Sequence, residues 1–348
     1  MRAVWFALLW AALSGCSHLG YYSQAVGGHI QLLWQRQSIE QLLQQPTLEP
    51  KQQQQLQLSQ RALEFAHSEL KLPDNGSYRS FVDLGSQRAV VWNVVATPAD
   101  SLIPKQWCFA IVGCLSYRGY YRREAAEAYA DKLRQQGLDV AVSGATAYST
   151  LGWLSDPLLS TMINRSDADL LEVIFHELAH QQLYIADDTM FNESFATTVA
   201  QAGVEAWYRH QATALPEGYL SSRQRRQQFR ALLLQIRQQL AQLYAAADPH
   251  HRSATIAQKQ QLFRQLQQHY QQLKQQWQGD SGYDSWMAQP LNNAHLALVA
   301  EYHAYVPLLE RVRQRSRSWE FFYQQLQPLA SLDREARHKR LQQLANGS

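Results

Sequence analysis

The apolar residues at the start of the chain follow a helical spacing. Between residues 17 and 72 they recur three, four or seven positions apart, as on a helix with one buried face. These positions are Leu32, Leu33, Ile39, Leu42, Leu43, Leu56, Leu63 and Leu70. Pro46 and Pro50 interrupt the pattern, because proline is poorly tolerated inside a helix. The segment therefore predicts helices on either side of the two prolines.

The next part of the chain, up to residue 150, changes to a strand-like pattern. Short apolar runs at 89–95, 109–112 and 139–143 predict buried strands. Between the last two runs, residues 122–136 predict a helix that ends at Gly137, since glycine is the usual residue just after a helix.

Helical patterns return further along the chain. Residues 166–207 predict two helices, and residues 291–345 are predicted to be helical again. Residues 221–278, rich in Gln and Arg, predict a hairpin of two long helices with a break near 248–251. Strands and helices thus come in separate blocks without βαβ alternation, which predicts an α+β fold.

Composition limits the classes of protein that fit. Of the 348 residues, 46% are hydrophobic and 18% are charged, so the chain can bury a core. Its 32 Lys and Arg residues nearly balance 29 Asp and Glu residues, which argues against nucleic acid as a partner. No apolar run approaches the roughly 20 residues that cross a bilayer, which excludes a polytopic membrane protein.

The N-terminus has the pattern of a bacterial lipoprotein signal. One arginine precedes a short apolar core at 4–13, and the tetrapeptide LSGC that ends at Cys16 resembles a lipobox. We predict a signal peptide at 1–15 and a mature domain at 16–348 that is anchored to the membrane through lipidated Cys16. Ser17 resembles the sorting signal of outer-membrane lipoproteins that face the periplasm. The alternative is an ordinary secretory signal with an unrelated cysteine.

Two further cysteines, Cys108 and Cys114, would then remain in an oxidising compartment. If the run between them is one extended strand, the two cysteines are roughly 20 Å apart, beyond the reach of a disulfide. A chain reversal near Gly113 would bring them together. The sequence leaves their pairing open.

The strongest chemical signal is the HExxH motif, His176-Glu-Leu-Ala-His180. Two histidines four positions apart lie on one helix face, within reach of a single metal ion, and Glu177 beside them can take a proton from water. The helix is supported independently by Ser166 as its N-cap and by an apolar face at 170–178. The alternative is a structural helix with two surface histidines.

A catalytic zinc site needs a third protein ligand and an open fourth position. On the next predicted helix, the segment FNESFA around Glu193 resembles the NEGFA segment of gluzincin aminopeptidases, in which the glutamate binds zinc. The resemblance implies His176, His180 and Glu193 as ligands of Zn2+, with Glu205 as the alternative to Glu193. Twelve residues separate His180 from Glu193, fewer than is usual in those enzymes, so 181–190 must contain a tight turn.

HELAHQ and FNESFA, with three further segments, resemble a family of bacterial lipoproteins described as putative zinc aminopeptidases. The further segments are 112–121, 148–157 and 292–295 with Tyr302. The resemblance covers most of residues 20–330 and implies a zincin-like metallopeptidase with a small mixed β-sheet. In one departure, residues 144–148 contain no acid, whereas in gluzincin aminopeptidases an acid upstream of HExxH binds the free amine of the substrate.

The resemblance implies hydrolysis of a peptide or protein substrate. Glu177 would act as the general base, and a tyrosine or histidine on a later helix would stabilise the oxyanion. Tyr302 is the first candidate for that donor, and the alternative for it is a core tyrosine. The next candidates are His295, His303 and Tyr305. Two other functions stay open: an envelope scaffold that retains a metal site and binds partners through the helical hairpin, and a peptidoglycan-directed zinc hydrolase.

Overall fold

The structure, a computed structural model, describes residues 21–22, 24–109, 113–147, 149–150, 154–299 and 305–347. The predicted signal peptide, Cys16, Tyr302 and His303 lie outside these ranges. The strands are β1 (Gln37–Ser38), β2 (Ser80–Val82), β3 (Val91–Pro98), β4 (Trp107–Phe109), β5 (Gly113–Leu115), β6 (Arg118–Tyr120), β7 (Leu138–Ala145) and β8 (Leu158–Leu159).

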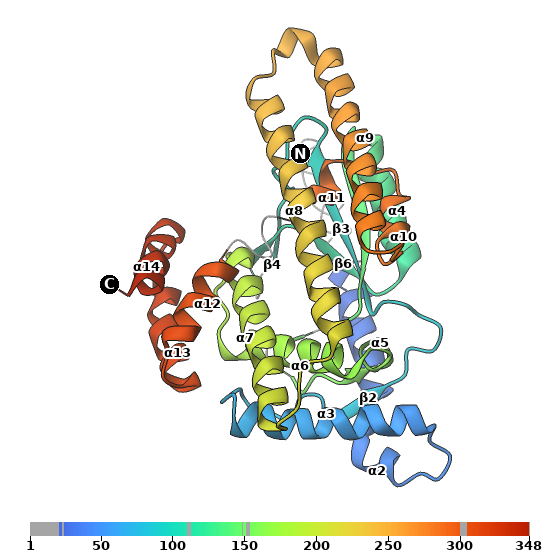
Figure 1. The fold of residues 1–348 in the computed structure, drawn as a ribbon. Coiled ribbons are helices and arrows are strands. Elements are labelled where there is room, and N and C mark those ends of the chain that lie inside the picture. Colours follow the sequence, from blue (N-terminus) through green and yellow to red (C-terminus); the bar gives the residue numbers. More distant parts are fainter. Residues whose placement is uncertain are drawn as a thin grey trace, which may run out of the picture.

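Helices make up most of the described chain, and the fold is mixed α+β as predicted (Figure 1). The first helical segment covers residues 21–22 and 24–34. The others are α2 (Ile39–Leu43), α3 (Pro50–Ser68), α4 (Arg123–Gln135), α5 (Ser160–Ile163), α6 (Asp167–Gln182), α7 (Thr189–His210), α8 (Glu217–Ala245), α9 (Arg252–Gln276), α10 (Asp284–Met287), α11 (Asn293–Ala297), α12 (Val306–Arg315), α13 (Trp319–Leu326) and α14 (Arg334–Asn346), with the 3-10 helices η1 (Pro249–His251) and η2 (Gln327–Ser331). Within the described ranges, none of the helices has the length and apolar character needed to cross a membrane.

The largest sheet has the strand order β6-β3-β7, and both outer strands run antiparallel to β3. β6 and β7 are therefore parallel to each other, and α4 connects them in sequence. This split βαβ unit corrects the expectation that no such unit is present. β6 is only three residues long and contains Arg and Gly, so it carries no apolar run that would reveal a strand.

Helices cover both faces of this sheet because its side chains alternate. Val94 and Ala96 of β3 pack with α4 on one face. Val95, between them, points to the other face and packs with Ala294 and Ala297 of α11. The sheet thus holds α11 in a fixed position.

The apolar run 109–112 is not one extended strand. β4 ends at Phe109, β5 begins at Gly113, and the two strands are antiparallel with Cys108 opposite Cys114. The two cysteines form a disulfide, which answers the question left open by the sequence. Gly113 has a φ of +75°, and a Cβ there would lie 2.4 Å from Oδ1 of Asp187, so only glycine fits at this reversal.

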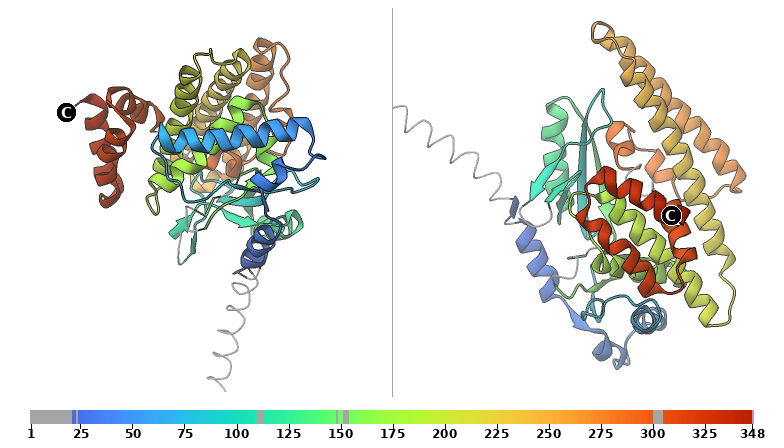
Figure 2. Two further views of the ribbon diagram at one scale, coloured as in Figure 1. Left: turned by 90° about the horizontal axis from the view of Figure 1, so that it is seen from below. Right: turned by 90° about the vertical axis from the view of Figure 1, so that its left-hand side faces the viewer.

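The main hydrophobic core lies where α3, α6 and α7 meet. Phe65 of α3 contacts Phe175 of α6 and Trp207 of α7, with ring centroids 6.1 and 5.2 Å apart. The C-terminal helices α12, α13 and α14 lie beside α7, as Figure 2 shows. Phe195 of α7 packs on Phe322 of α13 across this contact, at 6.1 Å between centroids.

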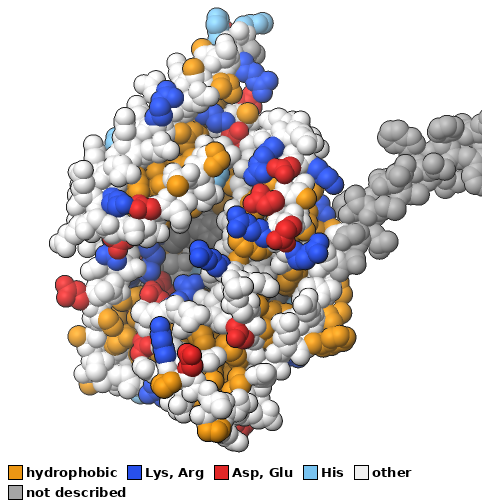
Figure 3. Space-filling model, turned by 90° about the vertical axis from the view of Figure 1, so that its right-hand side faces the viewer, with side chains coloured by type: hydrophobic (Ala, Val, Ile, Leu, Met, Phe, Trp, Pro, Cys, Tyr) orange, Lys and Arg blue, Asp and Glu red, His pale blue; other side chains and the backbone are white. Residues whose placement is uncertain are grey.

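α8 and α9 pack against each other and extend beyond the sheet (Figure 1). They share a core of their own, which includes Phe229, Ile236, Leu240, Leu266 and Tyr270. On the face shown in Figure 3, the surface is hollowed below these helices, and charged side chains of both signs gather over α4.

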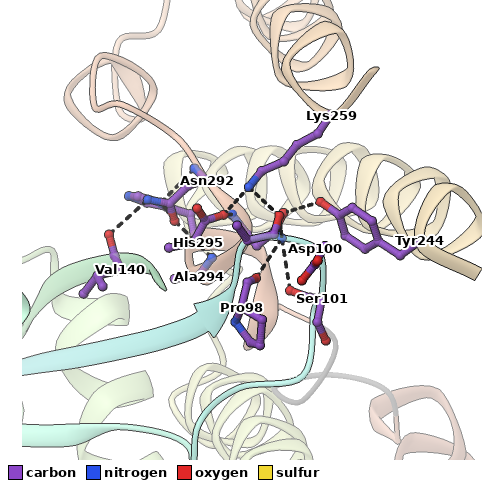
Figure 4. A network of polar contacts seen from close by, with 12 residues as sticks. Pro98, Asp100, Ser101, Val140, Tyr244, Lys259, Asn292, Ala294 and His295 are labelled. Carbon is purple, nitrogen blue, oxygen red and sulfur yellow. Dashed lines mark hydrogen bonds and ion pairs between the residues drawn. The ribbon is translucent and has the colours of Figure 1, made fainter. Parts of the chain in front are cut away.

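A buried polar network ties both long helices to the sheet (Figure 4). The Asn293 side chain is fully buried, donates to the carbonyl oxygens of residues 98, 99 and 101, and accepts from Tyr244 of α8 at 2.8 Å. Lys259 of α9 pairs with Asp139 of β7 and donates to the carbonyl oxygen of Ala99. Each buried polar group therefore has partners, and the network fixes α8 and α9 relative to α11.

Candidate metal centre

α6 carries both histidines of the HExxH motif. The helix begins as predicted, because the Ser166 hydroxyl accepts a hydrogen bond from the backbone N–H of Asp169 at 3.2 Å. Leu170, Ile174 and Leu178 are buried along one side. This apolar side sets the rotation of α6 and turns His176 and His180 toward α7.

Only six residues, 183–188, connect the end of α6 to the start of α7. Asn192 holds this turn with two hydrogen bonds, since its side chain accepts from the N–H of Ile185 and donates to the C=O of Ile185, both at 2.8 Å. Asp188 caps α7 by accepting from the N–H of Phe191. The connection is the tight turn that the short spacing predicted, and it places Glu193 opposite the histidines.

Three ligand-type atoms converge between α6 and α7. The Nε2 atoms of His176 and His180 are 3.1 Å apart. The carboxylate of Glu193 lies 3.4 Å from Nε2 of His176 and 3.7 Å from Nε2 of His180. Glu205, the alternative ligand, instead pairs with Arg223 at 2.7 Å. The structure therefore brings His176, His180 and Glu193 together, whereas Glu205 forms an ion pair elsewhere.

The donor set and its spacing fit a zinc ion. Ligand atoms about 2.0–2.2 Å from one ion at tetrahedral angles lie about 3.3–3.6 Å from one another, close to the three separations found here. Two imidazoles and one carboxylate are a common set for zinc with an open fourth position. Among the residues that the structure describes, these three form a group that could hold a metal ion.

The charges at the centre are strongly coupled. Burial lowers the pKa of His180 to about 4, and the nearby His176 adds to this effect. Burial also lowers the pKa of His176, but Glu193, Glu177 and Glu172 outweigh it and the net shift is upward. Burial raises the pKa of Glu177 to about 7, helped by Glu193 and Asp156. A buried centre with a second carboxylate beside the ligands is suited to handle one proton near neutral pH.

Two tyrosines at the centre had no role assigned from the sequence. Burial raises the pKa of Tyr117, and the charges of the Glu193 and Glu177 carboxylates raise it further. Burial and Glu193 raise the pKa of Tyr184 in the turn before α7. Tyr117 belongs to the segment 112–121 that contributed to the family resemblance, but it follows no helical spacing that would single it out.

Asp156 is a buried carboxyl that the sequence analysis also missed. Its side chain is inaccessible to solvent, and burial raises its pKa to about 6. Oδ2 accepts from the N–H of Thr150 at 2.8 Å, whereas Oδ1 has no hydrogen-bond partner within the described ranges. Asp156 lies near enough to Glu177 to raise the pKa of that residue. It stands upstream of HExxH, just beyond the acid-free stretch 144–148.

The other candidates for the oxyanion donor have structural positions or cannot be placed. His295 closes a capping box at the start of α11 with Asn292. Tyr305 packs its ring on His338 of α14, 5.2 Å between centroids. Tyr302 and His303 lie outside the described residues. The backbone N–H of Tyr305 donates to Ser194, next to Glu193, so the chain reaches the neighbourhood of the centre at residue 305.

Distant elements hold the two ligand helices in place. Arg226 of α8 pairs with Glu172 of α6 at 2.9 Å, one turn before His176. Arg337 of α14 pairs with Asp188, the N-cap of α7, and both side chains are buried. The C-terminal helix α14 therefore contacts the start of α7, the helix that carries Glu193.

Comparisons with known proteins point to one family. No curated protein and no solved structure matches the chain. The sequence model of the family described as "Putative aminopeptidase" matches residues 20–341, which is most of the chain. The match includes the HExxH helix, the turn and Glu193. The chain therefore belongs to the Putative aminopeptidase family.

Proposed function

We propose that the protein is a zinc-dependent peptidase with a zincin-like active site. The observation that carries this proposal is the convergence of His176, His180 and Glu193, with the half-buried Glu177 next to His176 on the same helix. A purely structural zinc site has no need of a base next to its ligands, and such sites favour cysteine and a closed shell of four ligands. The arrangement therefore supports an enzyme over a scaffold that retains a metal.

His176, His180 and Glu193 would hold the ion. Zinc, when bound, supplies a Lewis acid for the scissile carbonyl and lowers the pKa of a water molecule toward 7. Glu177 would accept a proton from the attacking water and pass it to the leaving amine, a role that suits its raised pKa. Burial of the centre strengthens these electrostatic interactions.

The oxyanion needs a hydrogen-bond donor from the protein. Tyr117 suits this role, because its raised pKa keeps the hydroxyl protonated and it is within electrostatic range of Glu193 and Glu177. Tyr302, the first candidate from the family resemblance, is the alternative to Tyr117. One removed donor of this kind costs on the order of 10²–10³-fold in turnover.

We also propose that the mature domain at 16–348 is a lipoprotein of the outer membrane that faces the periplasm. The support is the LSGC tetrapeptide that ends at Cys16, followed by Ser17. The disulfide between Cys108 and Cys114 suits the oxidising periplasm. A peptide or protein is the proposed substrate.

Digestion of a mixed peptide library by the zinc-loaded protein tests the peptidase proposal. We expect cleavage that stops when a chelator removes the metal and returns with zinc, and the ends of the products reveal whether single N-terminal residues are released. Peptides that stay intact with zinc bound would contradict the proposal. If only peptidoglycan fragments are cleaved, the protein is instead a peptidoglycan-directed hydrolase. If peptides bind but none is cleaved, the scaffold takes the place of the peptidase.

A further inference from the structure

The first helical segment, residues 21–22 and 24–34, is fixed to the protein by one of its faces. The side chain of Gln24 donates to the carbonyl of Gly119 and accepts from the N–H of Tyr121. A Cβ at Gly28 would lie 2.3 Å from the Tyr121 side chain, so the glycine permits close contact with the end of β6. Leu32 is buried in the main core. These three helix residues are spaced by four and mark the inner face.

The outer face of the same helix exposes a second stripe at the same spacing. Tyr22, Val26, Ile30 and Trp34 have 44%, 55%, 41% and 86% of their surfaces exposed. They are four of the eight large hydrophobic side chains that are exposed in the described part of the chain. Concentration of half of them along one line of one helix marks a surface that binds an apolar partner.

We propose that this stripe lies in the headgroup region of a lipid membrane. The first described helical residue, Tyr21, lies five positions after Cys16, and that many residues span at most about 20 Å. If Cys16 carries the lipid anchor proposed above, the stripe is held at the membrane surface. This inference rests on the proposed anchor for proximity but not on the peptidase activity.

The chemistry of the helix favours lipid over a second copy of the protein. Aromatic side chains stand at both ends of the stripe, Tyr22 and Trp34, where an amphipathic ring is most stable at a membrane interface. Residues 1–39 contain no Asp or Glu, so this segment itself brings no carboxylate to an anionic headgroup, and Arg36 follows the stripe.

The patch continues from the helix toward the candidate active site. Arg36 donates to the carbonyl oxygen of Ser155 at 3.1 Å, and Leu154, the residue before Ser155, is 46% exposed. Asp156 follows directly in sequence, and its charge raises the pKa of Glu177 at the centre. Figure 2 shows the N-terminal helix at the edge of the molecule. Contact through the stripe would therefore set which side of the enzyme is turned to the membrane.

Fluorescent labels on the lipidated mature protein test the inference. The chain has three cysteines, and with two in a disulfide and Cys16 lipidated, an introduced cysteine is the only free thiol. Ile30→Cys reports on the stripe, and Gln31→Cys, also exposed, is the matched control on the flank of the same helix. Both variants are reconstituted into vesicles of phosphatidylethanolamine and phosphatidylglycerol that contain nitroxide lipid.

We expect the nitroxide lipid to quench the label at position 30 at least threefold more than the label at position 31, with iodide in the water showing the reverse order. Equal quenching at the two positions in protein that floats with the vesicles would overturn the inference. A label at position 30 that is shielded from both quenchers, in a protein that dimerises, would assign the stripe to a second copy instead. Uptake of label by the unmodified chain would show a free Cys16, so failure of the anchor is recognised separately, and peptidase activity enters none of these readouts.

Discussion

Glu193 and Glu205 lie on the same helix, yet their side chains have different partners. Glu193 faces His176 and His180, whereas Glu205 pairs with Arg223 of α8. Glu193→Ala should weaken zinc binding by more than about 10²-fold. Even the loss of a residue that only hydrogen-bonds to a metal ligand lowers metal affinity by about 10–100-fold. Glu205→Ala should keep one zinc per chain. Elemental analysis of the two purified variants checks this, and zinc retained in the first but lost in the second would show that the wrong glutamate was chosen.

Asp156 predicts a measurable pH dependence of stability. Burial raises its pKa to about 6 in the folded protein, so the folded state holds this proton more tightly than the unfolded chain, where the value is about 3.9. Its contribution to stability is therefore present at low pH and is lost as the pH rises through about 4 to 6.

Asp156→Asn should remove this loss. The free energy of unfolding of the variant, relative to wild type, should rise by up to about 3 kcal/mol between pH 4 and pH 7. Urea unfolding of the metal-free proteins at several pH values measures it. Asp131→Asn, at an acid with 63% of its side chain exposed, is the control and should show no such trend. A difference between Asp156→Asn and wild type that does not change with pH would refute the assignment.

At the residue scale, sequence motifs identified the groups whose spacing is set by one helix or by adjacent helices. His176, Glu177 and His180 follow from the period of a helix, and Glu193 from the family resemblance. Tyr117 lies in the two-residue connection between β5 and β6, and Asp156 lies in the loop before β8. Their positions depend on tertiary packing, which has no repeat in the sequence.

Elements long enough to show a repeat were predicted well. The helix expected at 122–136 is α4, and the strand expected at 139–143 is the centre of β7. Elements of two to five residues, such as β6 and α11, show less than two full periods, so periodicity cannot reveal them. α11 owes its position to contacts from distant segments.

The network around Asn293 predicts how firmly α8 and α9 are held. Asn293→Ala would leave the hydroxyl of Tyr244 and three backbone carbonyls without their buried partner. We expect a loss of about 2–4 kcal/mol in the free energy of unfolding, since each unsatisfied buried group costs about 1–3 kcal/mol and water can satisfy some of them. Tyr244→Phe should cost only about 1 kcal/mol.

Urea unfolding measures both changes, and hydrogen exchange shows whether amides of α8 and α9 lose protection. His250→Ala, at the exposed end of these helices, serves as the control. A loss below about 0.5 kcal/mol for Asn293→Ala would mean that packing alone holds the two helices.

At the scale of the whole molecule, the C-terminal helices stabilise the helix that carries Glu193. Arg337 and Asp188 are 149 residues apart in sequence and form a buried ion pair. Arg337→Met removes one partner and leaves the other charge buried, which should cost about 3–5 kcal/mol. The double variant with Asp188→Asn should recover part of this loss. Arg340→Met, at an exposed position on the same helix, should change little.

Thermal or urea unfolding of the four proteins measures these differences. Equal stability of Arg337→Met and wild type would contradict the view that α14 supports α7. The hydrophobic pattern predicted helices at 291–345, but it could not predict which surface they cover, because that choice depends on one buried charge pair and on aromatic contacts such as Phe195 with Phe322.

The central claim is that Glu177 works as the base beside a zinc ion held by three ligands. The most direct measurement compares zinc content and peptide cleavage in wild type and Glu177→Gln, with Glu205→Gln as a control of the same chemistry away from the centre. We predict that Glu177→Gln keeps one zinc per chain and loses about 10²–10⁴-fold in kcat, because the volume of the side chain stays while its proton affinity is lost. Glu205→Gln should cleave like wild type. A Glu177→Gln protein that binds zinc and cleaves at the wild-type rate would contradict the account.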